Sequence, residues 1–435
     1  MPGGPTAWTS HQMQARIARR YARERRFRLL GLLAIGLAMG FLLLLLVSIA
    51  WRGAGGFFQA KLALDIHLDE GVIGVSPAAA ASPEGRDKVF AADYGRLIRE
   101  ALMARFPGVS GRADIRALAG LVSNGARQAL RDAVMETPDL IGQTQTFWLL
   151  ASDDVDQYIK GNISAALPES DRRLSDKELS WIESLRSDGR VKTVFHVPFF
   201  TGSDSREPEL VGIWGAIKGS FLTLLVTLII AFPIGLASAL YLEEFAPLNR
   251  MTDFIEVNIN NLAAVPSIVF GLLGLAVFLN SFGLPRSAPL VGGLTLALMT
   301  LPTIIIAARA AIKAVPPSIR AAAMGVGASP LQVVFHHVLP LALPGIMTGT
   351  IIGMARALGE TAPLLMIGMV AFVADVPHGF ADPATVLPVQ IYIWSDSPER
   401  AFLAKVSAAI LVLLVFLIAM NGLAVYVRNK FEKLW

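Results

Sequence analysis

Apolar positions along this chain gather into long runs, which alternate with stretches rich in polar residues. The runs are residues 29–51, 219–242, 257–285, 287–308, 341–372 and 406–427. A helix needs roughly 20 apolar residues to cross the hydrocarbon core of a bilayer, and each run is long enough. The third run is interrupted by Pro266, which cannot donate a helical hydrogen bond. The pattern predicts an all-α polytopic membrane protein with six spanning helices.

Residues 52–212 have a different composition. They contain 19 basic and 23 acidic residues, more than half of the charged residues of the chain, and no apolar run that could span a bilayer. A segment of about 160 residues is large enough to form its own hydrophobic core. We therefore expect a soluble domain inserted between the first and second spans, on the opposite side of the membrane from the N-terminus.

Local patterns within this segment predict mostly helices. Helical spacing of apolar residues is found in 93–105, 114–134 and 175–185, an extended pattern in 66–75 and 190–200, and a loop-forming composition in 76–85. The domain is therefore expected to be mixed α/β or mainly α. Asp153, Asp154 and Asp156 are interpreted as a helix start with a surface charge cluster, because the glycine and distal glutamate of a calcium loop do not follow.

Basic residues indicate which side of the membrane is cytoplasmic. The head, residues 1–28, has seven arginines against one acid, Glu24, and an apolar run follows directly, so we interpret it as a positive-inside anchor. That run is too long for a signal-peptide core and has no adjacent cleavage site, so 29–51 is predicted to be a membrane helix. The other basic groups on this face are Lys313, Arg320, Arg428, Lys430 and Lys433. Both termini are expected in the cytoplasm, and in a bacterium the soluble domain is periplasmic.

Composition excludes several classes of function. At 54% hydrophobic residues and a net charge of only +4, the chain is too apolar for a soluble protein of 435 residues. There is no cysteine, the histidines show no ligand spacing, and neither a Gly-Lys dipeptide nor a His-Glu-x-x-His motif occurs. We expect no catalytic residue, no metal site and no cofactor on this chain, so that any ATP is used by a partner subunit.

The polar stretch between the fourth and fifth runs is patterned like two short helices joined at a glycine bend. Ser318 is placed to N-cap the first helix, and Gly325 and Gly327 to end it. Ser329 followed by Pro330 is a second N-cap with proline at the first helical position. We therefore expect a structured loop on the cytoplasmic surface.

This loop carries a family pattern. Its positions are Ala321, Ala322, Ala323, Gly327, His337, Leu339 and Pro340. The spacing resembles that of the docking loop of ABC importer permeases, with Ala321 in place of the family's glutamate and His337 in place of its isoleucine. In that family the loop docks into a groove on the ATPase subunit. The resemblance implies a cytoplasmic docking loop at 313–340, with its ATPase-contacting part within 318–340.

Four further stretches narrow the resemblance. They are YLEEFAP at 241–247, NLAAVPSIVFGLLG at 261–274, RALGETAPL at 356–364 and LPVQIY at 387–392. They are similar to phosphate-specific transport permeases of the PstA type, whereas the companion PstC type usually reads Gly-Glu-Thr-Met where this chain has Gly-Glu-Thr-Ala-Pro. The resemblance covers about residues 213–435, an expected permease core with five spans, and residues 52–212 resemble an N-terminal extension of some members.

The resemblance implies a function and a set of partners. The chain would form the translocation pathway of an ATP-driven inorganic phosphate importer in the bacterial inner membrane, together with a second permease of the PstC type. An ATPase homodimer of the PstB type and a periplasmic phosphate-binding protein of the PstS type would complete the complex, without nucleic acid. Substrate identity follows from the resemblance and not from composition.

Three charged residues are candidates for the translocation pathway. Arg356 and Glu360 lie inside the fifth apolar run, where a charge costs about 2.5–3.5 kcal/mol at mid-bilayer and an i,i+4 pair returns only about 0.2–0.5 kcal/mol. They should face a partner subunit or a water-filled path, or form a structural ion pair at a helix interface. A guanidinium is suited to a tetrahedral oxyanion. Arg309 ends the fourth run and is either an exit-path residue or reaches the cytoplasmic surface.

Other functions stay open at this level. A permease for sulfate or molybdate would have the same composition and spans, and only the branch-specific stretches argue against it. A membrane sensor that uses residues 52–212 as a receptor would need an output domain, and only eight residues follow the last run. A secondary transporter would not need a docking loop.

Overall fold

The computed structural model describes residues 11–399 and 401–431, and it divides into two units, residues 1–52 and 53–435. Part of the predicted basic head, residues 1–10, and Lys433 lie outside the described residues. The first unit is formed by α1 (His11–Ala54), a single helix of 44 residues that continues from the arginine-rich head through the first apolar run. This helix is long and apolar enough to cross a membrane.

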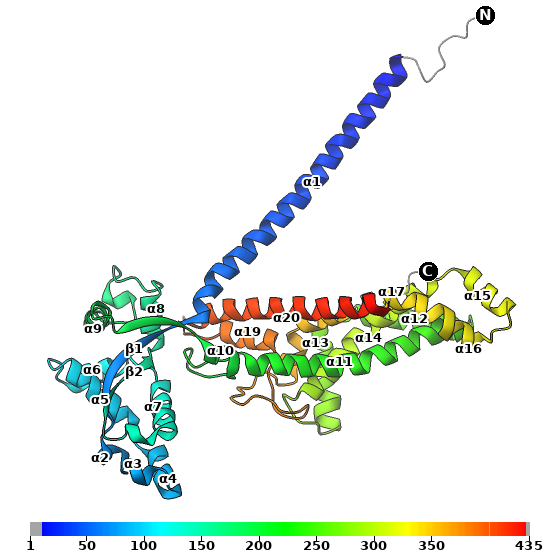
Figure 1. Cartoon of the computed structure of the whole chain (residues 1–435). Helices are drawn as coiled ribbons and strands as arrows, with labels where there is room; N and C mark the ends of the chain where they lie inside the picture. The colour runs from blue at the N-terminus through cyan, green and yellow to red at the C-terminus, as the bar shows by residue number, and fades with distance from the viewer. Residues whose placement is uncertain (1–10, 400, 432–435) are drawn as a thin grey trace, which may run out of the picture. The chain divides into compact units, whose positions relative to one another are not determined.

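The N-terminal part of the second unit, which the sequence predicts to be a soluble domain, is built on a three-stranded antiparallel sheet with order β2-β1-β3. Figure 1 labels its strands β1 and β2. The strands are β1 (Phe58–His67), β2 (Thr144–Leu150) and β3 (Val191–Phe195). In the register, Leu64 of β1 lies opposite Phe147 and Ala60 opposite Thr193. Alternate residues of the central strand β1 share one face, and Leu62, Leu64 and Ile66 are at most 2% exposed. This face is part of the hydrophobic core of the domain.

Short helices complete the domain around the sheet. They are α2 (Glu70–Ile73), α3 (Pro77–Ala80), α4 (Pro83–Ala91), α5 (Tyr94–Arg105), α6 (Arg112–Ala119), α7 (Gly125–Glu136), α8 (Asp153–Ile159), α9 (Asp176–Ser187) and α10 (Val197–Thr201), with 3₁₀ turns Gly55–Phe57, Pro138–Leu140 and Glu169–Asp171. The predicted helices at 93–105 and 175–185 are confirmed as α5 and α9. Ser175 and Glu178 form a capping box at the start of α9.

Several local predictions for this domain are wrong. The expected loop at 76–85 contains the starts of α3 and α4, and the expected helix at 114–134 is divided into α6 and α7. Of the extended segment expected at 66–75, only residues 66–67 belong to β1, which begins at Phe58, and α2 follows. The extended segment expected at 190–200 contains β3 and then α10. Asp156 is not on the surface: it is 5% exposed and accepts a hydrogen bond of 2.8 Å from the backbone N–H of Ala60.

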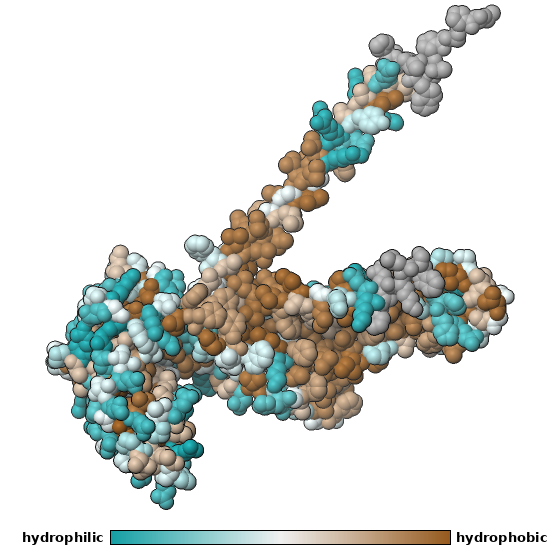
Figure 2. All heavy atoms as spheres, in the orientation of Figure 1, coloured by the Kyte–Doolittle hydropathy of each residue, from teal (hydrophilic) through white to brown (hydrophobic). Residues whose placement is uncertain are grey.

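The membrane part consists of long apolar helices, and Figure 2 shows the hydrophobic surface over them and the hydrophilic surface of the sheet domain. The long ones are α11 (Trp214–Leu240), α14 (Pro289–Lys313), α17 (Leu339–Gly359) and α20 (Ala401–Phe431). Shorter helices lie between them, namely α12 (Arg250–Ala263), α13 (Ser267–Gly274), α18 (Ala362–Met366) and α19 (Leu387–Ser395), with π-helical segments Tyr241–Phe245, Leu275–Ser281 and Val334–Val338. The mostly helical architecture that the sequence predicts is confirmed.

The number of spans depends on how the third apolar run is counted. Among the described residues, five helices are long and apolar enough to cross a membrane. A sixth span requires Arg250–Ala263 and Ser267–Ser281 to act as one, although they are bent by 99°. The bend falls at Pro266, the residue at which the sequence predicts an interruption.

The fifth run differs from the prediction. The expected helix to about residue 372 ends at Gly359, and Glu360 has extended backbone with ψ 124°. The short α18 follows, and residues 373–386 contain no helix or strand. Two hydrogen bonds tie the chain after α18 to Ser287, just before α14. The backbone N–H of Ala384 donates to Ser287 O at 2.9 Å, and the Ser287 hydroxyl donates to Gly368 O at 2.5 Å.

Helices α11 and α14 pack closely through small residues. A Cβ atom added to Gly293 would lie 2.8 Å from the carbonyl oxygen of Thr223 and 2.4 Å from Cβ of Val226. The hydroxyl of Thr227 donates to Thr223 O at 2.9 Å and to Gly293 O at 3.2 Å. Small residues and hydroxyl bonds of this kind bring membrane helices together, and they hold the central pair of this bundle.

Candidate functional site

The loop between α14 and α17 has the architecture that its residues predict, with two differences. It contains α15 (Pro317–Gly325) and α16 (Pro330–Val333), joined at Gly327, whose φ of +91° favours glycine. Ser329 and Gln332 form a capping box at the start of α16. The N-cap of α15 is Pro316, so the prediction of Ser318 in that role is wrong. The second helix is not separate, because a continuous helix runs from Pro330 to Gly359.

The predicted docking residues lie in different environments. Ala321 and Ala322 are exposed, whereas Ala323 is 5% exposed and packs into the core beneath the loop. Leu339 and Pro340 are half-buried at the start of α17. The exposed apolar side chains of the loop are instead Met324, Val326, Leu331 and Phe335, of which Val326 is 87% exposed.

An ion pair fixes the loop to the membrane helices. The guanidinium of Arg320, in α15, donates to Glu244 Oε1 at 2.6 Å. It also donates to the carbonyl oxygens of Val315 at 2.6 Å and Ile312 at 3.0 Å, which lie at the end of α14. The side chains of Arg320 and Glu244 are 21% and 11% exposed. One half-buried side chain thus joins α15, the end of α14 and the π-helical segment after α11.

A second ion-pair cluster lies at the same end of α14. Arg309 donates to Glu243 Oε2 at 3.3 Å and forms a closer pair with Glu256 of α12. Its side chain is 20% exposed. Glu243 and Glu244 are adjacent in a π-helical segment, a conformation that often occurs at functional sites. The sequence resemblance includes both glutamates, but it contains no signal that they pair with arginines so far along the chain.

Arg356 and Glu360 lie at a helix end and not in its interior. Arg356 is in the last turn of α17, and its Nε is 3.6 Å from Glu360 Oε1. The side chain of Arg356 is 53% exposed and that of Glu360 is 20% exposed. A cation is favourable at a helix C-terminus, so this position is less costly than the mid-bilayer site expected from the sequence. More than half of the Arg356 side chain therefore remains accessible.

The structure does not bring the three candidate pathway residues together. Arg309 lies in the last turns of α14, next to the loop. Arg356 lies at the other end of α17, which starts at the loop, and 17 helical residues correspond to about 25 Å. Arg309 is already paired with two carboxylates, whereas Arg356 has one weaker partner.

The soluble domain is connected to the last span by buried polar contacts. Nζ of Lys405 in α20 is 3.0 Å from Gly56 O and 2.8 Å from His196 Nδ1. Both side chains are nearly inaccessible, at 4% and 1% exposed. Burial, followed by the charge of Lys405, lowers the pKa of His196 to about 3. A neutral imidazole therefore accepts the hydrogen bond from the lysine, and the start of β1 and the end of β3 are held against α20.

Comparisons with known proteins agree with this architecture. Residues 231–433 match the family model described as binding-protein-dependent transport system inner membrane component, and residues 14–169 match a domain of unknown function (DUF3333). The chain is 32% identical over 251 residues to a probable ABC transporter permease protein, YqgI, of Bacillus subtilis, covering 53% of this chain and 84% of that protein.

Further relatives carry more specific names. Phosphate transport system permease protein PstA 1 of Mycobacterium tuberculosis is 32% identical over 219 residues, or 50% of this chain and 70% of that protein. PstA of Haemophilus influenzae is 29% identical over 221 residues, or 50% of this chain and 77% of that protein. Among solved structures, an inward-facing MetNI methionine ABC transporter aligns with a TM-score of 0.39 and 15% identity, over 51% of this chain and 95% of that one.

Proposed function

The chain belongs to the family of binding-protein-dependent transport permeases, in its PstA-type branch, and we propose that it forms part of the membrane pathway of an ATP-driven importer of inorganic phosphate. The observation that carries this proposal is the accessible guanidinium of Arg356 at the break between α17 and α18. The relatives named as phosphate transport permeases support the choice of substrate.

The backbone around Arg356 supports a pathway at this place. The helical backbone breaks at Glu360, between α17 and α18, and such a break at membrane depth is tolerated only where it is buried in protein or lines a water-filled cavity. Arg356 presents a forked set of donors that matches two oxygens of a tetrahedral oxyanion. Its 3.6 Å contact with Glu360 is loose enough to be exchanged for a ligand. Arg356 is the residue that would receive phosphate, and Glu360 would hold its side chain between passages.

The loop between α14 and α17 is the proposed contact with a separate ATPase subunit. Its exposed apolar side chains offer a surface that a partner groove would bury, in place of the polar contact of the missing glutamate. Arg320 ties this surface to the ends of α14 and α11, so a displacement of the loop by the ATPase would move those helices with it. Arg309, paired with Glu243 and Glu256, would hold the cytoplasmic end of the bundle closed.

The remaining parts of the complex follow from this role. We assign a second permease of the PstC type, an ATPase homodimer of the PstB type and an extracytoplasmic phosphate-binding protein of the PstS type as partners. The basic residues near both ends of the chain and at the end of α14 favour cytoplasmic termini in a bacterial inner membrane.

Uptake of radiolabelled phosphate tests the proposal. Cells that lack this gene and redundant systems should lose phosphate uptake and regain it when the gene is returned. About a tenfold excess of sulfate or molybdate over the labelled phosphate should not reduce that uptake. Uptake that is unchanged by the deletion would remove the substrate assignment. Competition by sulfate equal to that by unlabelled phosphate would favour a general oxyanion permease.

A further inference from the structure

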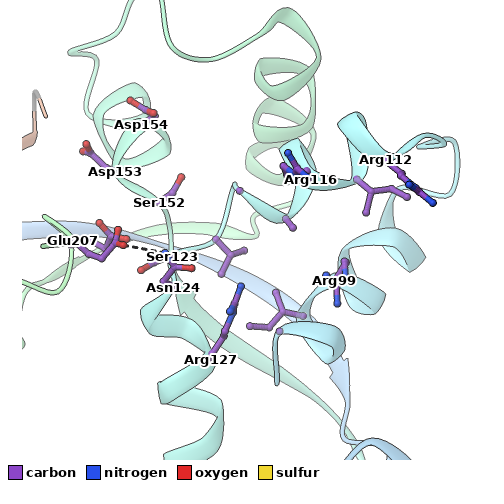
Figure 3. A pocket seen from close by; sticks show the side chains of 17 residues that line it. Arg99, Arg112, Arg116, Ser123, Asn124, Arg127, Ser152, Asp153, Asp154 and Glu207 are labelled. Atoms are coloured by element: carbon purple, nitrogen blue, oxygen red, sulfur yellow. Dashed lines mark hydrogen bonds between the residues drawn. The ribbon is translucent and has the colours of Figure 1, made fainter. Parts of the chain in front are cut away.

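The soluble domain contains a cavity with a divided charge distribution. Its volume is about 640 Å³, and it lies between α5, α6, α7 and the start of α8. That volume falls within the roughly 300–1,000 Å³ of small-molecule sites. Figure 3 shows arginines on one side and carboxylates on the other, namely Arg99, Arg112, Arg116 and Arg127 opposite Asp153, Asp154 and Glu207.

The arginines of the cavity differ from their neighbours on the same helices. Arg96 of α5 is paired with Glu100 at 2.7 Å, and Arg131 of α7 with Asp132 at 3.2 Å. Among the described residues, the four arginines of the cavity have no carboxylate within ion-pair distance. Three helices thus direct four arginines that form no ion pair among the described residues to one concave surface, opposite the carboxyl groups. A cluster of guanidinium groups favours a ligand that carries an anionic group.

The position of Arg127 depends on a glycine. A Cβ atom added to Gly95 of α5 would lie 2.9 Å from Nε of Arg127. The absence of a side chain at residue 95 therefore leaves room for the guanidinium of α7 to lie against α5. This packing holds Arg127 in the lining of the cavity, and Figure 3 shows it on the side of the cavity that Arg99 also lines.

The opposite side of the cavity is lined by the carboxyl groups of Asp153, Asp154, Glu207 and Glu209. Oδ1 of Asp153 is buried without a hydrogen-bond partner among the described residues. Burial raises the pKa of Asp153 to about 7, and the charges of Asp154 and Glu209 add to the effect. Glu207 accepts a hydrogen bond of 3.1 Å from Asn124. This side can therefore both donate and accept hydrogen bonds near neutral pH.

We propose that this cavity is a binding site for a phosphoryl group, either as inorganic phosphate or as part of a small phosphorylated compound. The guanidinium groups match tetrahedral oxyanions. The second pKa of a phosphomonoester is about 6, so a part of the phosphoryl groups carries a proton near neutral pH, and this protonated form can donate a hydrogen bond to a carboxylate. A sulfate dianion has no such proton and would face the carboxylates unfavourably. The site belongs to the soluble domain, so it goes beyond the proposed role of the membrane pathway.

Calorimetric titration of the full-length chain in lipid nanodiscs tests the site. The probes are inorganic phosphate, glycerol 3-phosphate and sulfate. Arg99→Gln and Arg127→Gln should each weaken binding roughly tenfold or more, because each removes a charge-assisted hydrogen bond. Arg96→Gln, the same change on the outer face of α5, should leave binding unchanged, because Arg96 is already paired with Glu100.

The outcomes separate the ligand sources and the two proposals. Binding of inorganic phosphate that is lost in the cavity variants supports a site for free phosphate, and binding of glycerol 3-phosphate alone supports a site for a phosphorylated compound. Sulfate binding of equal strength, no binding of either phosphate compound, or binding that both cavity variants retain would overturn the inference. Transport in cells is a separate measurement, so failure of either proposal leaves the other intact.

Discussion

Removal of the Arg320 side chain should weaken the link between the docking loop and the membrane helices. Arg320 makes a 2.6 Å bond to Glu244 and two bonds to carbonyl oxygens at the end of α14. Breaking a buried pair by removal of one partner costs about 3–5 kcal/mol, and a hydrogen bond to a charged group contributes about 1.5–3 kcal/mol. Because the two side chains are 21% and 11% exposed, we expect Arg320→Ala to lower the free energy of unfolding by about 2–4 kcal/mol.

The assay is a double-mutant cycle with Glu244→Ala, with unfolding followed in mixed detergent micelles. The double variant should lose less than the sum of the single variants, by about 1–3 kcal/mol, because the two side chains are in contact. Lys313→Ala, at an exposed position at the end of α14, is the control and should be nearly neutral. In the assembled complex, Arg320→Ala should retain ATP hydrolysis but lose phosphate uptake. A coupling energy near zero, or full uptake by Arg320→Ala, would refute the reasoning.

Three further changes are expected to have measurable effects. Arg356→Lys should insert normally but reduce phosphate uptake, since the forked donors are lost, and normal uptake by a well-expressed Arg356→Ala chain would remove the pathway role. His196→Ala should destabilise the chain more than Lys405→Met in thermal unfolding. His196→Ala leaves the buried amino group of Lys405 with one acceptor, whereas Lys405→Met removes that amino group. The reverse order of stabilities would contradict the buried contact. Burial raises the pKa of Asp153 from 3.8 to about 7, so the folded state holds this proton more tightly than the unfolded state and stability should fall as pH rises from about 4 to 7. Asp153→Asn should reduce that fall in melting curves, and an unaltered pH profile would argue against a buried carboxyl.

The features that the sequence predicts well are those encoded locally. A run of apolar residues is sufficient to place a span, and the Ser329-Pro330 pair is sufficient to place a helix start, because capping involves residues three positions apart. The same Ser-Pro signal occurs at Ser76 and at Ser82, where it starts α3 and α4. The composition of 76–85 outweighed it in our prediction, and a loop was expected where two helices form.

The features that the sequence does not reveal depend on distant contacts. Glu243 and Glu244 pair with arginines more than 60 positions away, and no periodicity reports such a pairing. Arg356 was expected at mid-bilayer because the apolar run continues past it, yet the helix ends at Gly359. The arginines of the soluble cavity are spread over three helices, so only folding shows that they share one surface.

Reconstituted transport tests the central claim most directly. Proteoliposomes would contain this chain, the second permease and the ATPase subunit, with the binding protein outside and ATP inside. We predict that labelled phosphate accumulates only when this chain and internal ATP are both present, and that collapse of the ion gradients does not prevent accumulation. Accumulation that is unaffected by omission of this chain, or that follows an ion gradient in the absence of ATP, would contradict an ATP-driven phosphate permease.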